Sequence, residues 1–207
     1  MITCKELRER ARNSLENNIF GGTWLFALLA CFVVSGITSV LAGSTVLAIL
    51  VPIFYGCFQF GLVSFFLNTV RRTADKNDLK PLISGFTDNI TRNIASGLLV
   101  SLFVFLWSLL LVIPGIVMAY AYSMTFYIMK DNPNLTALEA MKKSKEMMNG
   151  YKMQAFLLDL SFIGWWIVGI LTCGIGTLWV APYAQAAKTE LYEYIRANRQ
   201  GQFTIEA

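Results

Sequence analysis

The chain has 207 residues, of which 56% are hydrophobic and only 14% are charged. Soluble domains carry about a quarter charged residues, so this composition argues against a soluble globular protein and favours a chain that is solvated by a lipid bilayer. The sequence contains no histidine, which removes the commonest general base and the commonest metal ligand. A net charge of +4 could attract nucleic acid, but the positions of the charges along the chain indicate a membrane instead.

Three long stretches of the chain carry almost no charge. No charged residue occurs over 17–70 or 93–129, and Asp159 is the only one over 153–187. A helix that crosses a bilayer needs about 20 apolar residues, so each stretch is read as two crossings. Glycine and proline are the expected breakers between them. The predicted breaks are Gly43-Ser44-Thr45, Pro114-Gly115 and Gly174-Ile175-Gly176.

The predicted fold class is therefore all-α: a polytopic bundle of six transmembrane helices arranged as three hairpins. The fourth and sixth segments are short, and we expect them to continue as helix past Lys130 and Lys188, whose long side chains can reach the interface. Alternatively, these hairpins enter the bilayer only part-way, with their non-helical backbone covered by protein. The predicted crossings are Ile19–Ala42, Val46–Val70, Ile94–Ile113, Ile116–Met129, Met153–Thr172 and Leu178–Ala187.

The basic residues predict how these crossings are oriented. All 17 lysines and arginines fall in four segments, and the three predicted hairpin tips carry none. Basic residues in short loops stay in the cytoplasm, so an even number of crossings places all four segments and both termini on that side. The chain is predicted to form one membrane domain. Its parts are an N-terminal segment (1–18), hairpin one (19–70), a cytoplasmic segment (71–93), hairpin two (94–129), a second cytoplasmic segment (130–152), hairpin three (153–187) and a C-terminal tail (188–207).

The N-terminal segment shows the periodicity of an amphipathic helix. Leu7, Ala11 and Leu15 recur four residues apart, with arginines between them. This pattern suits a helix that lies in the membrane interface with its basic side towards anionic headgroups. The same helix could instead cover the cytoplasmic face of the bundle or dock a partner.

A second amphipathic helix is predicted from about 135 to 149. Thr136 and Glu139 form a possible capping box at its start. Leu135, Leu138 and Met141 are expected to lie along one side of it, with lysines supplying the charge. The same two interpretations apply: the helix covers the bundle, or it forms a docking surface.

Asp159 is the one ionisable residue inside a predicted crossing. It lies seven residues beyond Lys152, or about 10 Å along a helix. Charges within a bilayer are costly and often mark ion or substrate pathways; alternatively, Asp159 lies at the headgroup boundary or pairs with Lys152 or another cation. The candidate ligand-binding residues are Asp159, Gln59, Gln185 and Tyr183, with hydrogen bonding between helices as the alternative role of the two glutamines.

Other residues in the crossings are assigned to packing. Gly56 and Gly61 are expected to permit close approach of helices, and the pair Trp165 and Trp166 lies in the middle of a segment, where packing is its expected role.

No motif in the sequence indicates catalysis or metal binding. The four cysteines are widely spaced and form no Cys-x-x-Cys pair, and no nucleophile is followed by the residues of a known hydrolase or nucleotide-binding motif. We therefore predict no enzymatic activity, no metal and no cofactor. The cysteines are Cys4, Cys31, Cys57 and Cys173.

Five stretches in the second half of the chain resemble a known family. They are LWSLLLVIPGI (106–116), AYSMT (121–125), DNPNLTALEA (131–140), LSFIGW (160–165) and GIGTLWVAPY (174–183). Over 106–185 the chain resembles integral membrane proteins of Gram-positive bacteria that are described as a domain of unknown function. The resemblance implies a multi-pass protein of the bacterial plasma membrane, and it implies no particular activity.

The leading functional hypothesis is a non-enzymatic membrane protein with an accessory, protective or transport-assisting role. A small transporter or channel for a lipid, peptide or ion, using Asp159, is the alternative, and a lipid-modifying enzyme is the weaker one. The expected partners are membrane lipid and, as further candidates, another membrane protein or a second copy of the chain; no nucleic acid is expected.

Overall fold

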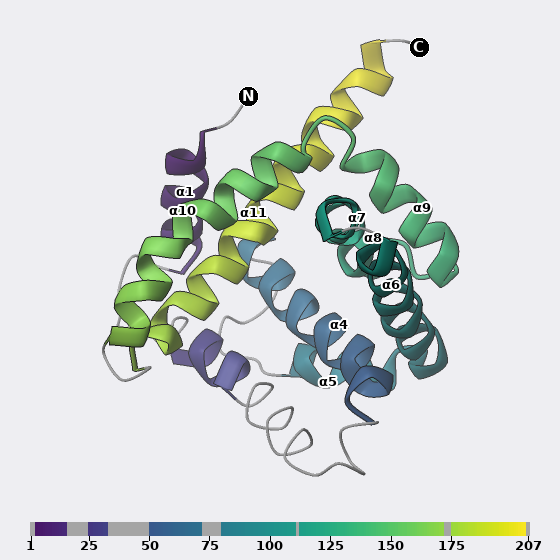
Figure 1. The fold of residues 1–207 in the computed structure, drawn as a ribbon, viewed down its shortest axis with the longest axis horizontal. Helices are drawn as coiled ribbons and strands as arrows, with labels where there is room; N and C mark the ends of the chain where they lie inside the picture. The colour runs from purple at the N-terminus through teal and green to yellow at the C-terminus, as the bar shows by residue number, and fades with distance from the viewer. Residues whose placement is uncertain are drawn as a thin grey trace. The chain divides into compact units, whose positions relative to one another are not determined.

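The computed structural model describes residues 3–15, 25–32, 50–71, 80–110, 112–171 and 175–205. In these ranges the chain is helical apart from short turns and contains no β-strand, as predicted. The predicted tip at Gly43-Ser44-Thr45, most of the first crossing and Gly174 lie outside the described residues. Figure 1 labels the helices α1 (Cys4–Ser14), α4 (Leu50–Arg71), α5 (Lys80–Thr87), α6 (Ile90–Leu110), α7 (Val112–Tyr122), α8 (Thr125–Asp131), α9 (Ala137–Met147), α10 (Lys152–Leu171) and α11 (Ile175–Ile205).

The chain divides into two compact units. Unit 1 comprises Met1–Cys31, Phe66–Asp78 and Met153–Ala207, and unit 2 comprises Phe32–Phe65 and Leu79–Lys152. Each unit contains one of the two amphipathic helices, α1 or α9, together with a helical hairpin.

The hairpin of unit 1 is formed by α10 and α11, which run antiparallel. Asp159 pairs with Lys188, the rings of Phe162 and Tyr183 meet edge to face, and Gly169 approaches Thr177 near the turn. As the residue number rises along α10, the contacted residue number falls along α11. Pro182 lies inside α11, where it removes one backbone donor from the helical ladder.

Helix α1 packs along α11 in unit 1. A complete capping box begins it: Thr3 accepts from the backbone N–H of Glu6, and Glu6 accepts from the backbone N–H of Thr3 at 2.8 Å. The predicted apolar face is confirmed, because Leu7, Ala11 and Leu15 are fully buried. This face therefore lies against protein, which agrees with the alternative in which the N-terminal helix covers part of the bundle.

Close contacts at glycines join α4, α5 and α6 in unit 2. A Cβ atom on Gly56 would collide with the Asn93 carbonyl and lie 2.9 Å from the Gly97 nitrogen. One on Gly61 would lie 3.0 Å from the Leu82 carbonyl carbon, and one on Gly85 would overlap the backbone of Cys57 in the same way. The expected packing role of Gly56 and Gly61 is thus confirmed.

The second predicted hairpin breaks earlier than expected. Helix α6 ends at Leu110, and Pro114 and Gly115 lie within the first turns of α7 rather than between two helices. Proline is tolerated there because the first backbone N–H groups of a helix have no intrahelical partner. Gly115 allows α7 to approach α6, since a Cβ atom on it would lie 2.8 Å from the Cα of Ser108.

The predicted crossing 116–129 is not one helix. Helices α7 and α8 are separated by a turn at Ser123 and Met124. The hydroxyl of Ser144, on α9, accepts from the Met124 backbone N–H at 3.2 Å and donates to the Ala121 carbonyl at 2.8 Å. A buried side chain thus supplies hydrogen bonds where the helix is interrupted.

Helix α9 begins with the predicted capping box of Thr136 and Glu139. Its predicted apolar face is confirmed at Met141, which is buried, and is wrong at Leu138. Leu138 is 57% exposed, because the buried side of the helix lies one position away from it. That side contacts α6, α7 and α8. Its members are Ala137, Ala140, Met141, Ser144 and Met148.

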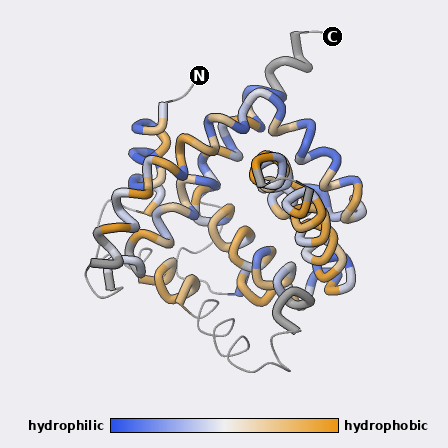
Figure 2. Tube along the Cα trace, in the orientation of Figure 1, coloured by the Kyte–Doolittle hydropathy of each residue, from blue (hydrophilic) through white to orange (hydrophobic). Residues whose placement is uncertain are grey.

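Helices α6 and α10 expose many large apolar side chains. Phe105 is 64% and Leu109 74% exposed on α6, and Trp165 is 50% and Trp166 39% exposed on α10, so neither tryptophan belongs to the buried core of the described residues. Figure 2 shows hydrophobic residues along most of α6 and many hydrophilic ones along α9. Among the described residues, one helical segment, Ile90–Leu109, is long enough and apolar enough to cross a membrane; its mean hydropathy is 1.6, and 17% of it is buried.

Candidate functional site

Three of the four predicted ligand-binding residues lie in unit 1. The Asp159 carboxylate forms an ion pair with Lys188 Nζ at 3.1 Å, and both side chains are partly exposed. The Tyr183 hydroxyl donates to the Arg8 carbonyl at 3.1 Å. The Gln185 carbonyl accepts from the Thr189 hydroxyl at 3.0 Å. Asp159 and Tyr183 thus join helices of unit 1, which is the structural alternative that the sequence left open.

Gln59 lies in unit 2 and is described separately. Its side-chain nitrogen donates to the hydroxyl of Tyr55, one turn earlier on α4, at 3.0 Å. Of the predicted breakers, Gly176 lies near the start of α11, and a Cβ atom on Gly169 would be 3.2 Å from its carbonyl carbon. Gly174 lies outside the described residues.

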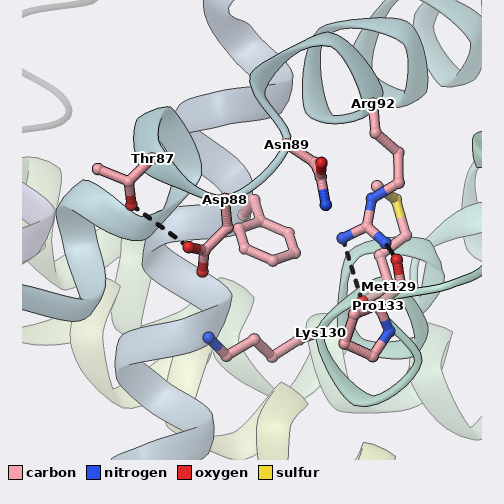
Figure 3. Close-up of a pocket in the computed structure, with 8 residues that line it drawn as sticks. Thr87, Asp88, Asn89, Arg92, Met129, Lys130 and Pro133 are labelled. Atoms are coloured by element: carbon pink, nitrogen blue, oxygen red, sulfur yellow. Dashed lines mark hydrogen bonds between the residues drawn. The ribbon is translucent and has the colours of Figure 1, made fainter.

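A cavity of about 430 Å³ in unit 2 gathers charged side chains that the sequence did not single out (Figure 3). It lies where the corner between α5 and α6 meets the end of α8. Its floor is apolar and buried, and its rim is exposed and polar. The lining residues are Phe60, Thr87, Asp88, Asn89, Arg92, Met129, Lys130 and Pro133.

The α5–α6 corner has its own local causes. Asn89 adopts a φ of 50°, a left-handed conformation that asparagine tolerates better than most residues. The buried side chain of Asn93 then closes the corner, donating to the Gly85 carbonyl at 2.8 Å and the Asp88 carbonyl at 2.9 Å. The first turn of α6 is therefore fixed at the edge of the cavity.

Arg92 forms the wall between α6 and the α8–α9 connection. Its terminal nitrogens donate to the carbonyls of Met129 at 3.4 Å, Leu135 at 3.5 Å and Pro133. Met129 and its neighbours end α8, so a cation there complements the negative end of the helix dipole. The Nε atom of Arg92 is buried and has no hydrogen-bond partner.

The ring of Phe60 lies beneath two cations. Arg92 lies 6.0 Å and Lys130 lies 5.6 Å from the ring centroid, which is within the range of cation–π attraction. Arginine keeps its charge in proteins, so the lining carries two positive groups and one negative group.

This set of residues favours binding over bond cleavage. The hydroxyl in the lining, Thr87, makes only long hydrogen bonds of 3.4 Å, to the Ile83 carbonyl and to Asp88. An activated nucleophile needs an adjacent base that is oriented by a third group. Over the described part of the chain, no cluster of histidine, cysteine, aspartate or glutamate could hold a metal ion.

One sequence signal could have identified this cavity. Arg92 and Lys130 are the two charged residues that border the uncharged stretch 93–129. The two ends of a helical hairpin lie at the same level, so its bordering charges meet in space. Phe60 offered no comparable signal, because it lies in the middle of an apolar stretch.

Comparison with known proteins finds one family. Residues 108–199 match the family described as Protein of unknown function (DUF975). The match includes Lys130, Asp159 and Tyr183, but it begins after Phe60 and Arg92. It covers most of 106–185, where the sequence resembles this kind of family. No curated protein matches the chain. No solved structure matches it either.

Proposed function

We propose that this protein is a non-enzymatic integral membrane protein of the bacterial plasma membrane, with six crossings and both termini in the cytoplasm. Its role is accessory, protective or transport-assisting: the bundle binds membrane lipid or supports another membrane component without chemical turnover.

The observation that carries this proposal is the exposed apolar surface of α6. Its 21 residues span about 32 Å, comparable with the hydrocarbon core of a bilayer. Burying one large apolar side chain is worth about 1.5–3 kcal/mol, so a row that includes Leu102, Phe105 and Leu109 would be costly in water. Lipid removes that cost.

The packing of α9 bears on how deeply the second hairpin enters. Met141 of α9 belongs to the same buried cluster as Tyr122. Leu99 and Phe103, near the middle of α6, pack against this cluster. Helix α7 has 11 residues, or about 16 Å, so a full fourth crossing requires α7 and α8 together. A hairpin that enters only part-way is the alternative.

Cysteine labelling tests the topology. Single cysteines at Ser44→Cys, Ile113→Cys and the native Cys173 would probe the three tips in an otherwise cysteine-free chain, and Asn134→Cys would probe the cytoplasmic side. With a membrane-impermeant maleimide on intact cells, the three tips should react, and Asn134→Cys should react only after permeabilisation. If Ile113→Cys alone stays unlabelled, hairpin two enters part-way; labelling of Asn134→Cys in intact cells refutes the orientation.

Mass spectrometry of the protein, purified in mild detergent from its native membrane, tests the role. Lipid or a partner protein in stoichiometric amount, without turnover of labelled lipids, is the expected result. Sustained lipid hydrolysis by the purified chain would instead favour the lipid-modifying enzyme.

A small transporter or channel is the second candidate. The ion pair of Asp159 with Lys188 supports it, because an ion pair that opens can exchange its partner for a transported ion. Reconstitution in vesicles should then show a flux that Asp159→Asn abolishes; an unchanged flux removes this candidate.

A further inference from the structure

We propose that the cavity of unit 2 binds a phosphate group, held by the ammonium of Lys130 and attracted by the positive charge of Arg92 at the start of α6. This inference deepens the proposed function and rests on it only for the source of the phosphate, which is a phospholipid headgroup or a free phosphate ion.

The fixed charge of Arg92 is the first argument. Its terminal nitrogens bind backbone carbonyls, which fixes the guanidinium plane at the cavity wall. Its Nε is buried, so Arg92 attracts an anion in the cavity through its charge and not through a further hydrogen bond.

Lys130 supplies the side-chain donor and a second positive charge. Its ammonium lies over the Phe60 ring, a contact that leaves its three N–H groups able to donate to a ligand. Figure 3 shows the Lys130 nitrogen and Arg92 on opposite sides of the cavity, with Asp88 on the side of the Lys130 nitrogen and Asn89 beside Arg92. Two cations against one carboxylate leave a net positive site.

The first turn of α6 adds to the attraction. Asn89 and Arg92 of the lining bracket the start of a 21-residue helix, whose first backbone N–H groups and positive dipole end favour anions. A phosphate has several acceptor oxygens, so it can accept from an ammonium and from backbone donors at once while a guanidinium charge lies nearby.

The two cations of the cavity border the predicted crossings of hairpin two, which is where a phospholipid headgroup is expected to lie. The rim is exposed, which also admits free phosphate.

Titration of the purified, delipidated full chain tests the proposal. Native mass spectrometry would follow binding of phosphatidylglycerol, of diacylglycerol with the same acyl chains, and of phosphatidylglycerol with inorganic phosphate as competitor. Lys130→Gln should weaken phosphatidylglycerol binding about tenfold or more, as expected for loss of one charged hydrogen bond. Lys142→Gln, which removes the same charge from the exposed side of α9, should leave it unchanged. Diacylglycerol, which has no phosphate, should bind equally to both variants.

Competition identifies the source. If inorganic phosphate displaces the lipid from the wild type but has no such effect on Lys130→Gln, the ligand is free phosphate; if it fails to displace the lipid, the ligand is the headgroup. Equal weakening by Lys130→Gln and Lys142→Gln overturns the proposal, as does diacylglycerol binding that depends on Lys130.

A second variant covers the case in which Lys130→Gln does not fold. Asp88 is exposed, and Asp88→Asn removes the negative charge that would repel a phosphate, so binding should tighten severalfold. Unchanged or weaker binding by Asp88→Asn contradicts the proposal. The topology labelling is independent of these results, so failure of the phosphate site would leave the membrane assignment standing.

Discussion

The two units join their helices by different chemistry. Unit 1 uses partly exposed polar pairs: Arg71 with Glu193 at 2.7 Å, Asp159 with Lys188 at 3.1 Å, and the Ser14 hydroxyl with Glu190. Unit 2 uses backbone contact at Gly56, Gly61 and Gly85, where unit 1 has such a contact at Gly169, and it adds buried hydrogen bonds from side chains to the backbone. Water can replace a lost partner in an exposed polar pair, whereas a helix that contacts a glycine leaves no space for a side chain at that position. Unit 2 should therefore be far less tolerant of substitution.

The largest difference is expected at glycines. Gly56→Ala in unit 2 places a Cβ atom against the backbone of Asn93 and Gly97, and overpacking of this kind should lower the free energy of unfolding by about 3 kcal/mol or more. Gly164 in α10 is the matched control, because no atom lies within 4 Å of its Cβ position. Gly164→Ala should be neutral or stabilising by up to about 1 kcal/mol. Thermal unfolding in detergent, followed by tryptophan fluorescence, measures both; equal midpoints would mean that α4 and α6 are not in contact.

Buried and exposed serines should differ next. Ser144→Ala removes the hydrogen bonds to the Met124 N–H and the Ala121 carbonyl, both buried, and should cost about 1–3 kcal/mol. Ser14→Ala removes a half-exposed bond to Glu190, where water can replace the hydroxyl, and should cost less. The same unfolding measurement compares them. A larger loss for Ser14→Ala would reverse the contrast between the units.

The ion pairs of unit 1 should contribute little. The side chains of Asp159 and Lys188 are 32% and 43% exposed, so solvent screens them, and Asp159→Asn should cost at most about 1 kcal/mol. Because screening by salt weakens exposed pairs, the difference from wild type should shrink at high salt. A larger, salt-independent loss would show that lipid or protein closes this pair off from water.

The smallest effect concerns a feature that both units share. Hydrogen bonds from Thr136 lower the pKa of Glu139, and those from Thr3 lower the pKa of Glu6. A depressed folded pKa means that the stabilisation is present above the ordinary value of 4.5 and is lost as the pH falls through the folded pKa. Helicity should therefore fall slightly below about pH 4.5, and Glu139→Gln and Glu6→Gln should each flatten the profile. Circular dichroism against pH tests this; a change confined to one variant would separate the two caps.

Several features could be predicted because they depend on neighbours in sequence. The spacing of Leu7, Ala11 and Leu15 defines a helical face whatever that face meets, and the pair Thr136 and Glu139 makes its capping box within a single turn. The all-helical character follows from long apolar stretches without the alternation of strands. The small residues Gly56 and Gly61 indicated close approach, though not which helix would approach.

Other features depend on partners distant in sequence, and there the predictions failed or were silent. Leu138 is more apolar than Ala140 and Ser144, yet the helices that meet α9 contact the side bearing those two residues, so Leu138 is exposed. Proline at position 114 was expected to separate two helices, but the first turn of a helix tolerates it, so the break lies before it.

The sequence alone determined helix content, the two amphipathic helices, the cap of the second one and the confinement of basic residues to four segments, because each is a property of adjacent residues and their hydrogen bonds or solvation. Only the tertiary structure decided which faces are buried, how each unit joins its helices, and that Phe60, Arg92 and Lys130 line one cavity. These outcomes depend on which segments, distant in sequence, pack against each other, and no local pattern of residues predicts that packing.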